Sequence, residues 1–530
     1  MTYARFAAES KLAACLLPFV FSSFLAPPAL SAQVRYVQQR ASAGILEGVV
    51  SPDGKVRTFK GIPFAAAPVG PLRWKPPQPV TPWTGVRKAV EFAPRCMQTR
   101  VYADMVFRDL GPSEDCLYLN LWIPEVHEKS PLPVMVWIYG GGFVAGAASE
   151  PRQDGGNLCK KGVLVVTMNY RLGIFGFFSH PELARESGRD TTGNYGLQDQ
   201  LAALKWVKEN IAVFGGDPDN VTIFGESAGS SSVSALMASP LAKGLFRHAI
   251  GESGAIIGNS LREKSRAESE KVDVEFAKSY LGTDSLAALR ALPAGEILQA
   301  ASKEGAPSFG PNIDGYFLPE SVEAVFAAGK QSRVPLLAGW NLDEGNFRGI
   351  FGEKEPSTRN FAMKIRSLYG ANAKTILKLY PASTAAEAKR SAQDLAGDRF
   401  IAFATWKCLE LHLTTGKSPV FRYRFDQTLP LPADHASSDE PTAPHAGEIE
   451  FVFQMLSSKD LPWRPEDHKV SDLMSSYWTN FAKTGDPNGE SLPRWPAYMP
   501  EEFQVMHLSA DPHAAPDPHR ARYLFLDEIR

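Results

Sequence analysis

The chain has 530 residues, of which 44% are hydrophobic and 22% are charged, and its formal net charge is -2. This composition is ordinary for a folded globular protein and leaves ample material for a core. The near-balanced charge excludes the clustered basic excess that nucleic-acid binding requires, so we expect a small-molecule substrate and no nucleic-acid partner. Neither a linker nor a repeat marks an internal boundary, and one large domain is expected over residues 33–530.

Residues 1–32 have the pattern of a signal peptide. Arg5 and Lys11 precede an apolar stretch over residues 12–30, and the small residues Ser31 and Ala32 suit a cleavage site. Prolines interrupt the stretch, and no other segment has the length and apolarity of a membrane span, so stable membrane insertion is not expected. The pattern therefore predicts a secreted or periplasmic protein, in which cysteines can form disulfides.

The next segments predict strands. Polar and apolar residues alternate over residues 48–64, which indicates antiparallel hairpin strands, and the proline-rich stretch at 63–82 indicates an irregular surface crossing. Four short runs of apolar and β-branched residues follow, and such runs are typical of buried strands in a mostly parallel sheet. These runs lie at residues 117–123, 134–139, 163–169 and 221–224.

A helix is predicted between the last two of these strands. Four apolar residues recur there at helical spacing, namely Leu201, Leu204, Val207 and Ile211. Strand, helix and strand in succession indicate an α/β fold, a large doubly wound sheet with helices on both faces and ligands beyond the carboxyl ends of its strands. Residues 260–415 mostly predict helices, with a short strand at 335–339, and we expect a helical insertion over the active site.

The sharpest chemical signal is the sequence Gly-Glu-Ser-Ala-Gly at residues 225–229, directly between the predicted strand at 221–224 and a helix predicted at 230–237. This is the G-x-S-x-G nucleophile elbow in the context that it requires. A chain that turns sharply from strand into helix leaves no room for β-carbons two positions either side of the serine, so glycines are needed there. Ser227 is therefore the predicted nucleophile. The similar sequence around Ser253 lacks the final glycine, and that serine is expected to be structural.

Acyl transfer also needs hydrogen-bond donors aimed at the developing oxyanion. Three glycines at residues 140–142 directly follow the predicted strand at 134–139, where a backbone without side chains can approach a carbonyl group. We expect the N–H groups of Gly141 and Gly142, together with that of Ala228, to be these donors.

A serine nucleophile needs a histidine to take its proton and a carboxylate to orient that histidine. In this fold the acid and then the histidine follow the nucleophile along the chain. The loop after the predicted strand at 335–339 carries Asp343 and Glu344, and the residue pattern does not choose between them. Among the later histidines, His435 and His445 are the best candidates for the base, because they lie in a polar loop between two apolar runs. Because the base must be neutral, activity should fall on acidification through the histidine range.

These residues belong to a set of motifs by which the chain resembles the type B carboxylesterase and cholinesterase family of α/β-hydrolases, from about residue 48 to about residue 498. Besides the elbow, the motifs are Phe59-Lys60-Gly61-Ile62-Pro63, Glu114-Asp115-Cys116-Leu117-Tyr118-Leu119-Asn120, Tyr139-Gly140-Gly141-Gly142-Phe143, Asn169-Tyr170-Arg171, Gly193-Asn194-Tyr195-Gly196, Asp343-Glu344-Gly345 and His445-Ala446-Gly447-Glu448. The resemblance implies a serine carboxylesterase that hydrolyses small-molecule esters through an acyl-enzyme. It implies Ser227, Glu344 and His445 as the catalytic triad.

The resemblance also implies a disulfide between Cys96 and Cys116 that closes a loop near the mouth of the site. Cholinesterases carry a tryptophan about ten residues before the cysteine that matches Cys116, whereas this chain has Val106 and Phe107 in that region, so a cation–π site for choline is not expected. The oligomerising tail of cholinesterases is missing too, and we expect a monomer or a homodimer.

Two other classes of function compete with this interpretation. The same triad serves hydrolases of amides, carbamates and lipids, and cholinesterase-like folds also serve as non-catalytic binding modules, which typically lose the nucleophile. No Cys-x-x-Cys or Cys/His spacing suggests a metal ligand set, so no metal is predicted, and serine ester hydrolysis needs no cofactor.

Overall fold

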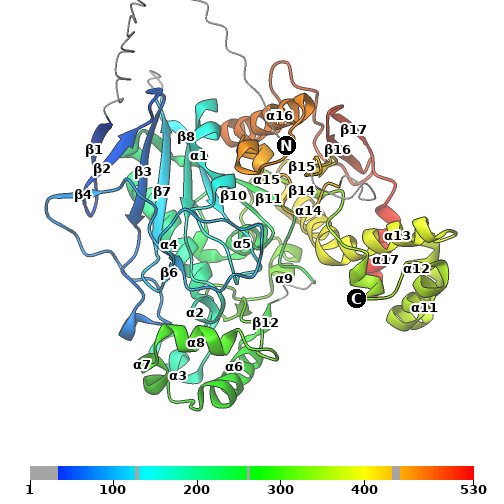
Figure 1. Cartoon of the computed structure of the whole chain (residues 1–530), viewed down its shortest axis with the longest axis horizontal. Helices are drawn as coiled ribbons and strands as arrows, with labels where there is room; N and C mark the ends of the chain where they lie inside the picture. Colours follow the sequence, from blue (N-terminus) through cyan, green and yellow to red (C-terminus); the bar gives the residue numbers. More distant parts are fainter. Residues whose placement is uncertain (1–33, 126–129, 259–262, 433–441) are drawn as a thin grey trace, which may run out of the picture. The chain divides into compact units, whose positions relative to one another are not determined.

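A central sheet of parallel strands, extended by antiparallel strands at both edges, organises the protein in the computed structural model (Figure 1). The structure describes residues 34–125, 130–258, 263–432 and 442–530, and Arg35–Arg530 form one compact unit. The signal peptide predicted at residues 1–32 lies outside the described residues. In spatial order the sheet contains β1 (Arg35–Ala41), β2 (Gly44–Val50), β3 (Val56–Pro63), β7 (Tyr118–Pro124), β9 (Leu164–Met168), β8 (Leu132–Ile138), β10 (Gly216–Glu226), β11 (His248–Glu252), β14 (Leu336–Asn341), β15 (Val420–Phe425), β16 (Gln504–Leu508) and β17 (His513–Pro516).

The strands from β9 to β16 in this order pair in parallel, and the pairs outside them are antiparallel. The alternating residues near the N-terminus form antiparallel β2 and β3, as expected. The run at residues 117–123 forms a buried strand, as expected, and this strand, β7, is one of the antiparallel members of the mostly parallel sheet, since it pairs antiparallel with both β3 and β9. An apolar run indicates that a strand is buried on both faces of the sheet, but it does not indicate the direction of the strand.

Short strands and pairs lie outside this order: β4 (Val86–Lys88) pairs with β2, β5 (Arg95–Cys96) with β6 (Pro112–Ser113), and β12 (Lys264–Ser265) with β13 (Asn312–Ile313).

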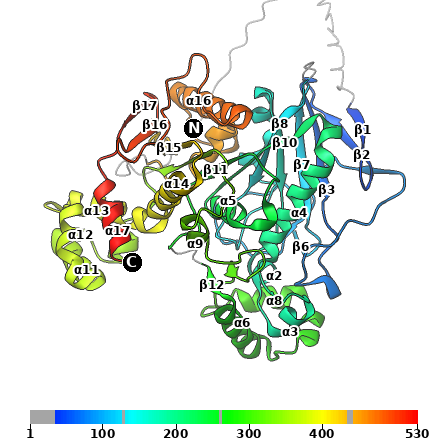
Figure 2. The same ribbon diagram turned by 180° about the vertical axis from the view of Figure 1, so that it is seen from behind.

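Helices cover both faces of the sheet, as Figures 1 and 2 show from opposite sides. On one face lie α4 (Tyr195–Asn210), α5 (Ala228–Ala238), α9 (Val322–Ala327) and α14 (Phe403–Gly416). On the other face lie α1 (Gly155–Leu158), α15 (Ile449–Val452) and α16 (Pro465–Thr484). Their apolar faces bury the sheet: the residues of β9 and β11 are all buried, and along α4 and α5 most are. Burial of such surfaces is the main stabilising contribution to an α/β fold.

The remaining helices form two groups outside these layers. The first group, α2 (Gly173–Phe177), α3 (Pro181–Glu186), α6 (Arg266–Leu281), α7 (Leu286–Ala291) and α8 (Ala294–Ala301), gathers at one end of the sheet (Figure 1). The second group is α10 (Arg348–Phe351), α11 (Thr358–Tyr369), α12 (Ala373–Leu379), α13 (Ala385–Gly397) and α17 (Arg520–Glu528). Most of these helices belong to the predicted insertion, which enters the sheet once, as β14.

Candidate active site

Ser227 lies at the sharp turn between β10 and α5, with backbone angles of φ 56° and ψ -118° that residues other than glycine rarely adopt. A β-carbon on Gly225 would lie 2.4 Å from the carbonyl oxygen of Ile138, and one on Gly229 would lie 1.9 Å from the same oxygen. Both contacts are far too short, so the turn requires glycine at these two positions. The turn leaves Ser227 at the carboxyl end of the parallel strands, next to the N-terminus of α5.

A chain of hydrogen bonds links Ser227 to a histidine and a carboxylate from two other loops. The Nε2 atom of His445 lies 2.9 Å from Ser227 Oγ, and its Nδ1 atom lies 2.6 Å from Glu344 Oε2. These loops follow β14 and β15, so all three side chains meet at the same edge of the sheet. The arrangement can transfer a proton from the serine hydroxyl to a histidine that a carboxylate orients.

Glu344 is held in place by two further hydrogen bonds. Its Oε1 atom accepts a hydrogen bond from the Ser253 hydroxyl, at 2.5 Å, and another from the backbone N–H of Asn341, at 2.7 Å. Because its hydroxyl donates a hydrogen bond to the Glu344 carboxylate, Ser253 lies at the site but is not placed as a nucleophile. The sequence predicts a structural serine here, and its hydrogen bond to Glu344 is visible only in the structure.

The neighbouring carboxylate, Asp343, points elsewhere. Its Oδ1 atom accepts hydrogen bonds from Arg390 at 2.7 Å and Gln393 at 2.8 Å, and its Oδ2 atom accepts one from the backbone of Ala443 at 2.9 Å. Asp343 thus ties its loop to α13 and to the segment that carries His445. The alternative histidine, His435, lies outside the described residues.

The three predicted oxyanion donors follow two neighbouring parallel strands: Gly141 and Gly142 come shortly after β8, and Ala228 directly follows Ser227 after β10. In the part of the chain that the structure describes, the N–H groups of Gly141, Gly142 and Ala228 make no hydrogen bond. For Ala228 the reason is its place at the first position of α5, where helical N–H groups have no partner within the helix. Gly141 has φ +100° and Gly142 has φ +64°, which is the left-handed region that glycine tolerates. All three groups are available to a developing negative charge on a substrate.

A second carboxylate faces the histidine, and sequence reasoning missed it. Glu226, the residue before Ser227, is buried, and its Oε1 atom lies 3.2 Å from His445 Nε2. Burial lowers the pKa of His445, but the charges of Glu226 and Glu344 outweigh burial and raise this pKa above its usual range. Burial also raises the pKa of Glu226, to about 8. The only signal in the sequence was the position of this glutamate inside the elbow motif.

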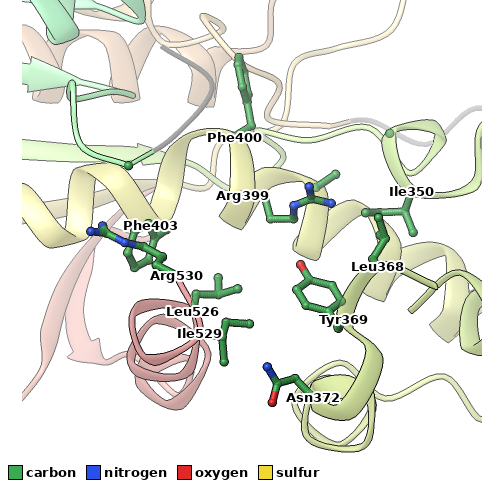
Figure 3. Close-up of a pocket in the computed structure, with 13 residues that line it drawn as sticks. Ile350, Leu368, Tyr369, Asn372, Arg399, Phe400, Phe403, Leu526, Ile529 and Arg530 are labelled. Atoms are coloured by element: carbon green, nitrogen blue, oxygen red, sulfur yellow. The ribbon is translucent and has the colours of Figure 1, made fainter. Parts of the chain in front are cut away.

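Phe400 links His445 to a cavity in the region of the helical insertion. The ring of Phe400, in the π-helical turn η7 (Asp398–Ala402), packs edge-on against His445 with ring centroids 5.1 Å apart. Phe400 also lines a cavity of about 670 Å³ between η7, α11 and α17. Figure 3 shows Leu526 and Ile529 on one side of this cavity and Tyr369 on the other. The predicted insertion therefore reaches His445 through one aromatic ring.

Cys96 and Cys116 form the expected disulfide, and Cys159 and Cys408 are free and buried. Among the described residues, no group of His, Cys, Asp and Glu side chains is arranged to hold a metal ion. Within the same residues, no helix combines the length and apolarity that crossing a bilayer requires.

Comparison with known proteins assigns the family. The model of the carboxylesterase family matches residues 33–525 of the chain. The chain belongs to the carboxylesterase family. Carboxylic ester hydrolysis is the activity of this family, and all the motifs that carried the resemblance lie within the matched range.

Curated and solved relatives agree with this assignment. The chain is 36% identical to the fumonisin B1 esterase of Sphingopyxis macrogoltabida, over 93% of this chain and 91% of the relative. It is 38% identical to the para-nitrobenzyl esterase of Bacillus subtilis (strain 168), over 87% of this chain and 93% of the relative. A solved PNB esterase structure matches 94% of this chain and 100% of its own, with a TM-score of 0.78 and 35% identity. The α/β-hydrolase fold expected from the sequence is thus confirmed.

Proposed function

We propose that this carboxylesterase hydrolyses small-molecule carboxylic esters through an acyl-enzyme on Ser227, with His445 as general base and acid and Glu344 as the carboxylate that orients it. The observation that carries the proposal is the unbroken chain of hydrogen bonds from Glu344 through His445 to Ser227, at 2.6 and 2.9 Å. A binding module that had lost catalysis would not need to retain these three groups in reach of one another.

In the first half of the reaction, His445 Nε2 takes the proton of the Ser227 hydroxyl while Oγ bonds to the ester carbonyl carbon. The carbonyl oxygen becomes an oxyanion, and the N–H groups of Gly141, Gly142 and Ala228 stabilise its charge. The carbon–oxygen bond to the alcohol then breaks, and His445 returns the proton to the departing alkoxide. The acid part of the substrate remains attached to Ser227.

In the second half, His445 takes a proton from a water molecule, and the hydroxide attacks the acyl carbon. The bond to Oγ breaks, Ser227 recovers its proton from His445, and the carboxylic acid leaves. Throughout both halves Glu344 stabilises the imidazolium and fixes the tautomer of His445. Two hydrogen bonds on the far oxygen of Glu344 hold it in that orientation.

The names of the relatives leave the acid and alcohol groups open, since they include a fumonisin B1 esterase, a para-nitrobenzyl esterase and a fatty acyl-CoA hydrolase precursor. The same triad could act on amides, carbamates or lipids. A lipase gains activity when its substrate forms an interface, whereas we expect this enzyme to gain none. Rates on one short-chain ester below and above its solubility limit distinguish the two.

The test is hydrolysis of p-nitrophenyl esters of short and medium acids by the mature protein and by a Ser227→Ala variant. The wild type should release p-nitrophenolate and the variant should not. The matched control is Ser253→Ala, which removes a serine from the similar sequence 26 positions further along; it should weaken turnover without abolishing it. Turnover by Ser227→Ala would show that another residue is the nucleophile, and inactivity of the wild type on every ester would reject the proposal.

We also propose that residues 1–32 are a signal peptide and that the mature protein is exported as a monomer or homodimer. The disulfide between Cys96 and Cys116 supports an oxidising compartment. N-terminal sequencing of the exported protein and size-exclusion chromatography test the two parts. An intact leader on a cytoplasmic protein would reject export, and a larger assembly would reject the monomer or homodimer.

A further inference from the structure

Tyr102 belongs to the irregular segment between Cys96 and Cys116, and its hydroxyl lies over the oxyanion glycines. The hydroxyl oxygen is 3.3 Å from the position that a β-carbon on Gly142 would occupy. Met105, three residues further along, brings its methyl carbon within 3.0 Å of the corresponding position on Gly141. The segment therefore covers one face of the glycines, with a hydroxyl beside one and a methyl group beside the other.

The segment is anchored on both sides of Tyr102. Before it, the Gln98 side chain donates a hydrogen bond to the carbonyl of Gly146 at 2.8 Å, and the Gly146 N–H donates one back at 3.0 Å. After it, Arg108 donates a hydrogen bond to the carbonyl of Ser149 at 3.0 Å. Both contacts tie the segment to the chain that follows the oxyanion glycines, and the disulfide closes its ends. The position of Tyr102 is thus fixed by its surroundings.

The hydroxyl of Tyr102 makes no hydrogen bond to the part of the protein that the structure describes, and the side chain is 40% exposed. Nearby buried tyrosines differ, since the Tyr170 hydroxyl donates to the carbonyl of Tyr139 at 2.8 Å. Burial and the charge of Glu226 raise the pKa of Tyr102, so its hydroxyl stays protonated and able to donate.

We propose that the Tyr102 hydroxyl recognises the substrate, by donating a hydrogen bond to an ether, hydroxyl, carbonyl or carboxylate oxygen within a few atoms of the scissile carbonyl. This inference rests on the proposed function, in which Gly141 and Gly142 hold the carbonyl oxygen and so bring the neighbouring atoms of the substrate under Tyr102. An alkyl group at the same place would displace water from the hydroxyl without offering it an acceptor, and this loss disfavours binding of the alkyl ester. The enzyme should therefore prefer esters that carry an oxygen there over alkyl esters of equal size.

The experiment compares isosteric pairs of esters in the wild type and in Tyr102→Phe, which keeps the ring and removes the hydroxyl. On the acid side the pair is p-nitrophenyl methoxyacetate and p-nitrophenyl butyrate; on the alcohol side it is 2-methoxyethyl acetate and butyl acetate. Each rate is divided by the rate of hydroxide-catalysed hydrolysis, which removes differences in intrinsic reactivity. In at least one pair, Tyr102→Phe should lower kcat/KM for the oxygen-containing ester about 2- to 10-fold and leave the alkyl ester nearly unchanged.

The matched control is Tyr118→Phe. Tyr118 begins β7, directly after the segment, and its hydroxyl donates to Asp115 at 2.8 Å, so its loss should leave both ratios unchanged. An unchanged ratio in both pairs for Tyr102→Phe would overturn the inference, and so would an equal fall for both members, which indicates a structural role. Neither result affects the proposed function, which fails if the wild type hydrolyses no ester or if the rates do not depend on Ser227.

Discussion

Replacement of Glu226 by glutamine removes the second carboxylate that faces His445 and should change the pH dependence of the reaction. The two side chains approach within 3.2 Å. A unit charge about 4 Å away contributes about 4 kcal/mol at an effective dielectric constant of about 20, which is about 3 pKa units. Because burial raises the pKa of Glu226 to about 8, this carboxyl group is protonated over much of the neutral range, and only part of that interaction is expressed. We expect the pKa of His445 to fall by about 1 to 2 pH units in Glu226→Gln.

The sign follows from the role of the histidine. His445 accepts the proton of Ser227 only when it is neutral, so kcat/KM rises with pH through the pKa of His445. In the wild type this pKa is raised, so the acid limb of the profile should lie above the ordinary histidine range, higher than the sequence alone predicts. In Glu226→Gln the limb should move to lower pH.

The assay is the profile of kcat/KM against pH for one soluble ester, measured from about pH 5 to pH 9 for both proteins. The control is the variant Glu252→Gln, which changes another buried glutamate, one whose carboxylate accepts a hydrogen bond from Trp478 at 2.8 Å. This control should move the acid limb much less. A limb that stays in place in Glu226→Gln, or moves to higher pH, would refute the reasoning.

Three further variants test other parts of the site. Ser253→Ala removes one of the bonds that orient Glu344, and kcat should fall about 10-fold or more while KM changes little; an unchanged kcat would contradict this role. Gly141→Ala places a β-carbon 2.3 Å from a carbonyl oxygen at φ +100°, which displaces the donor, so kcat should fall about 100-fold or more, and wild-type turnover would count against the oxyanion assignment. The double variant Cys96→Ser and Cys116→Ser opens a loop with a sequence separation of 20, so the free energy of unfolding should fall by about 3 kcal/mol in a denaturant titration, and an unchanged free energy of unfolding would contradict this.

The elbow was predictable because its elements are local. A strand was expected at 221–224 and a helix at 230–237, and the structure has β10 (Gly216–Glu226) and α5 (Ala228–Ala238) around Ser227. The requirement for Gly225 and Gly229 follows from a turn that the motif itself defines, and the short contacts to Ile138 show its physical basis. The end of the strand, the serine and the start of the helix are adjacent in the sequence, where spacing determines geometry.

Other features depend on contacts that spacing does not encode. Asp343 and Glu344 are adjacent in sequence, and only the packing against Arg390 and Ser253 separates their directions. The sequence does not give the direction of β7, because burial on both faces looks the same in either orientation. Tyr102 belongs to an irregular segment with no periodic signal, and its distance from the glycines results from the disulfide and from long-range hydrogen bonds.

The most direct test of the account is to identify the residue that forms the covalent intermediate. A fluorophosphonate inhibitor imitates the ester and phosphonylates an activated serine, and peptide mass spectrometry locates the label. The account predicts one label for each chain, on the peptide that contains Ser227, with loss of activity in proportion to labelling and no label on Ser227→Ala. Complete inactivation with the label on another residue, or equal labelling of Ser227→Ala, would contradict it.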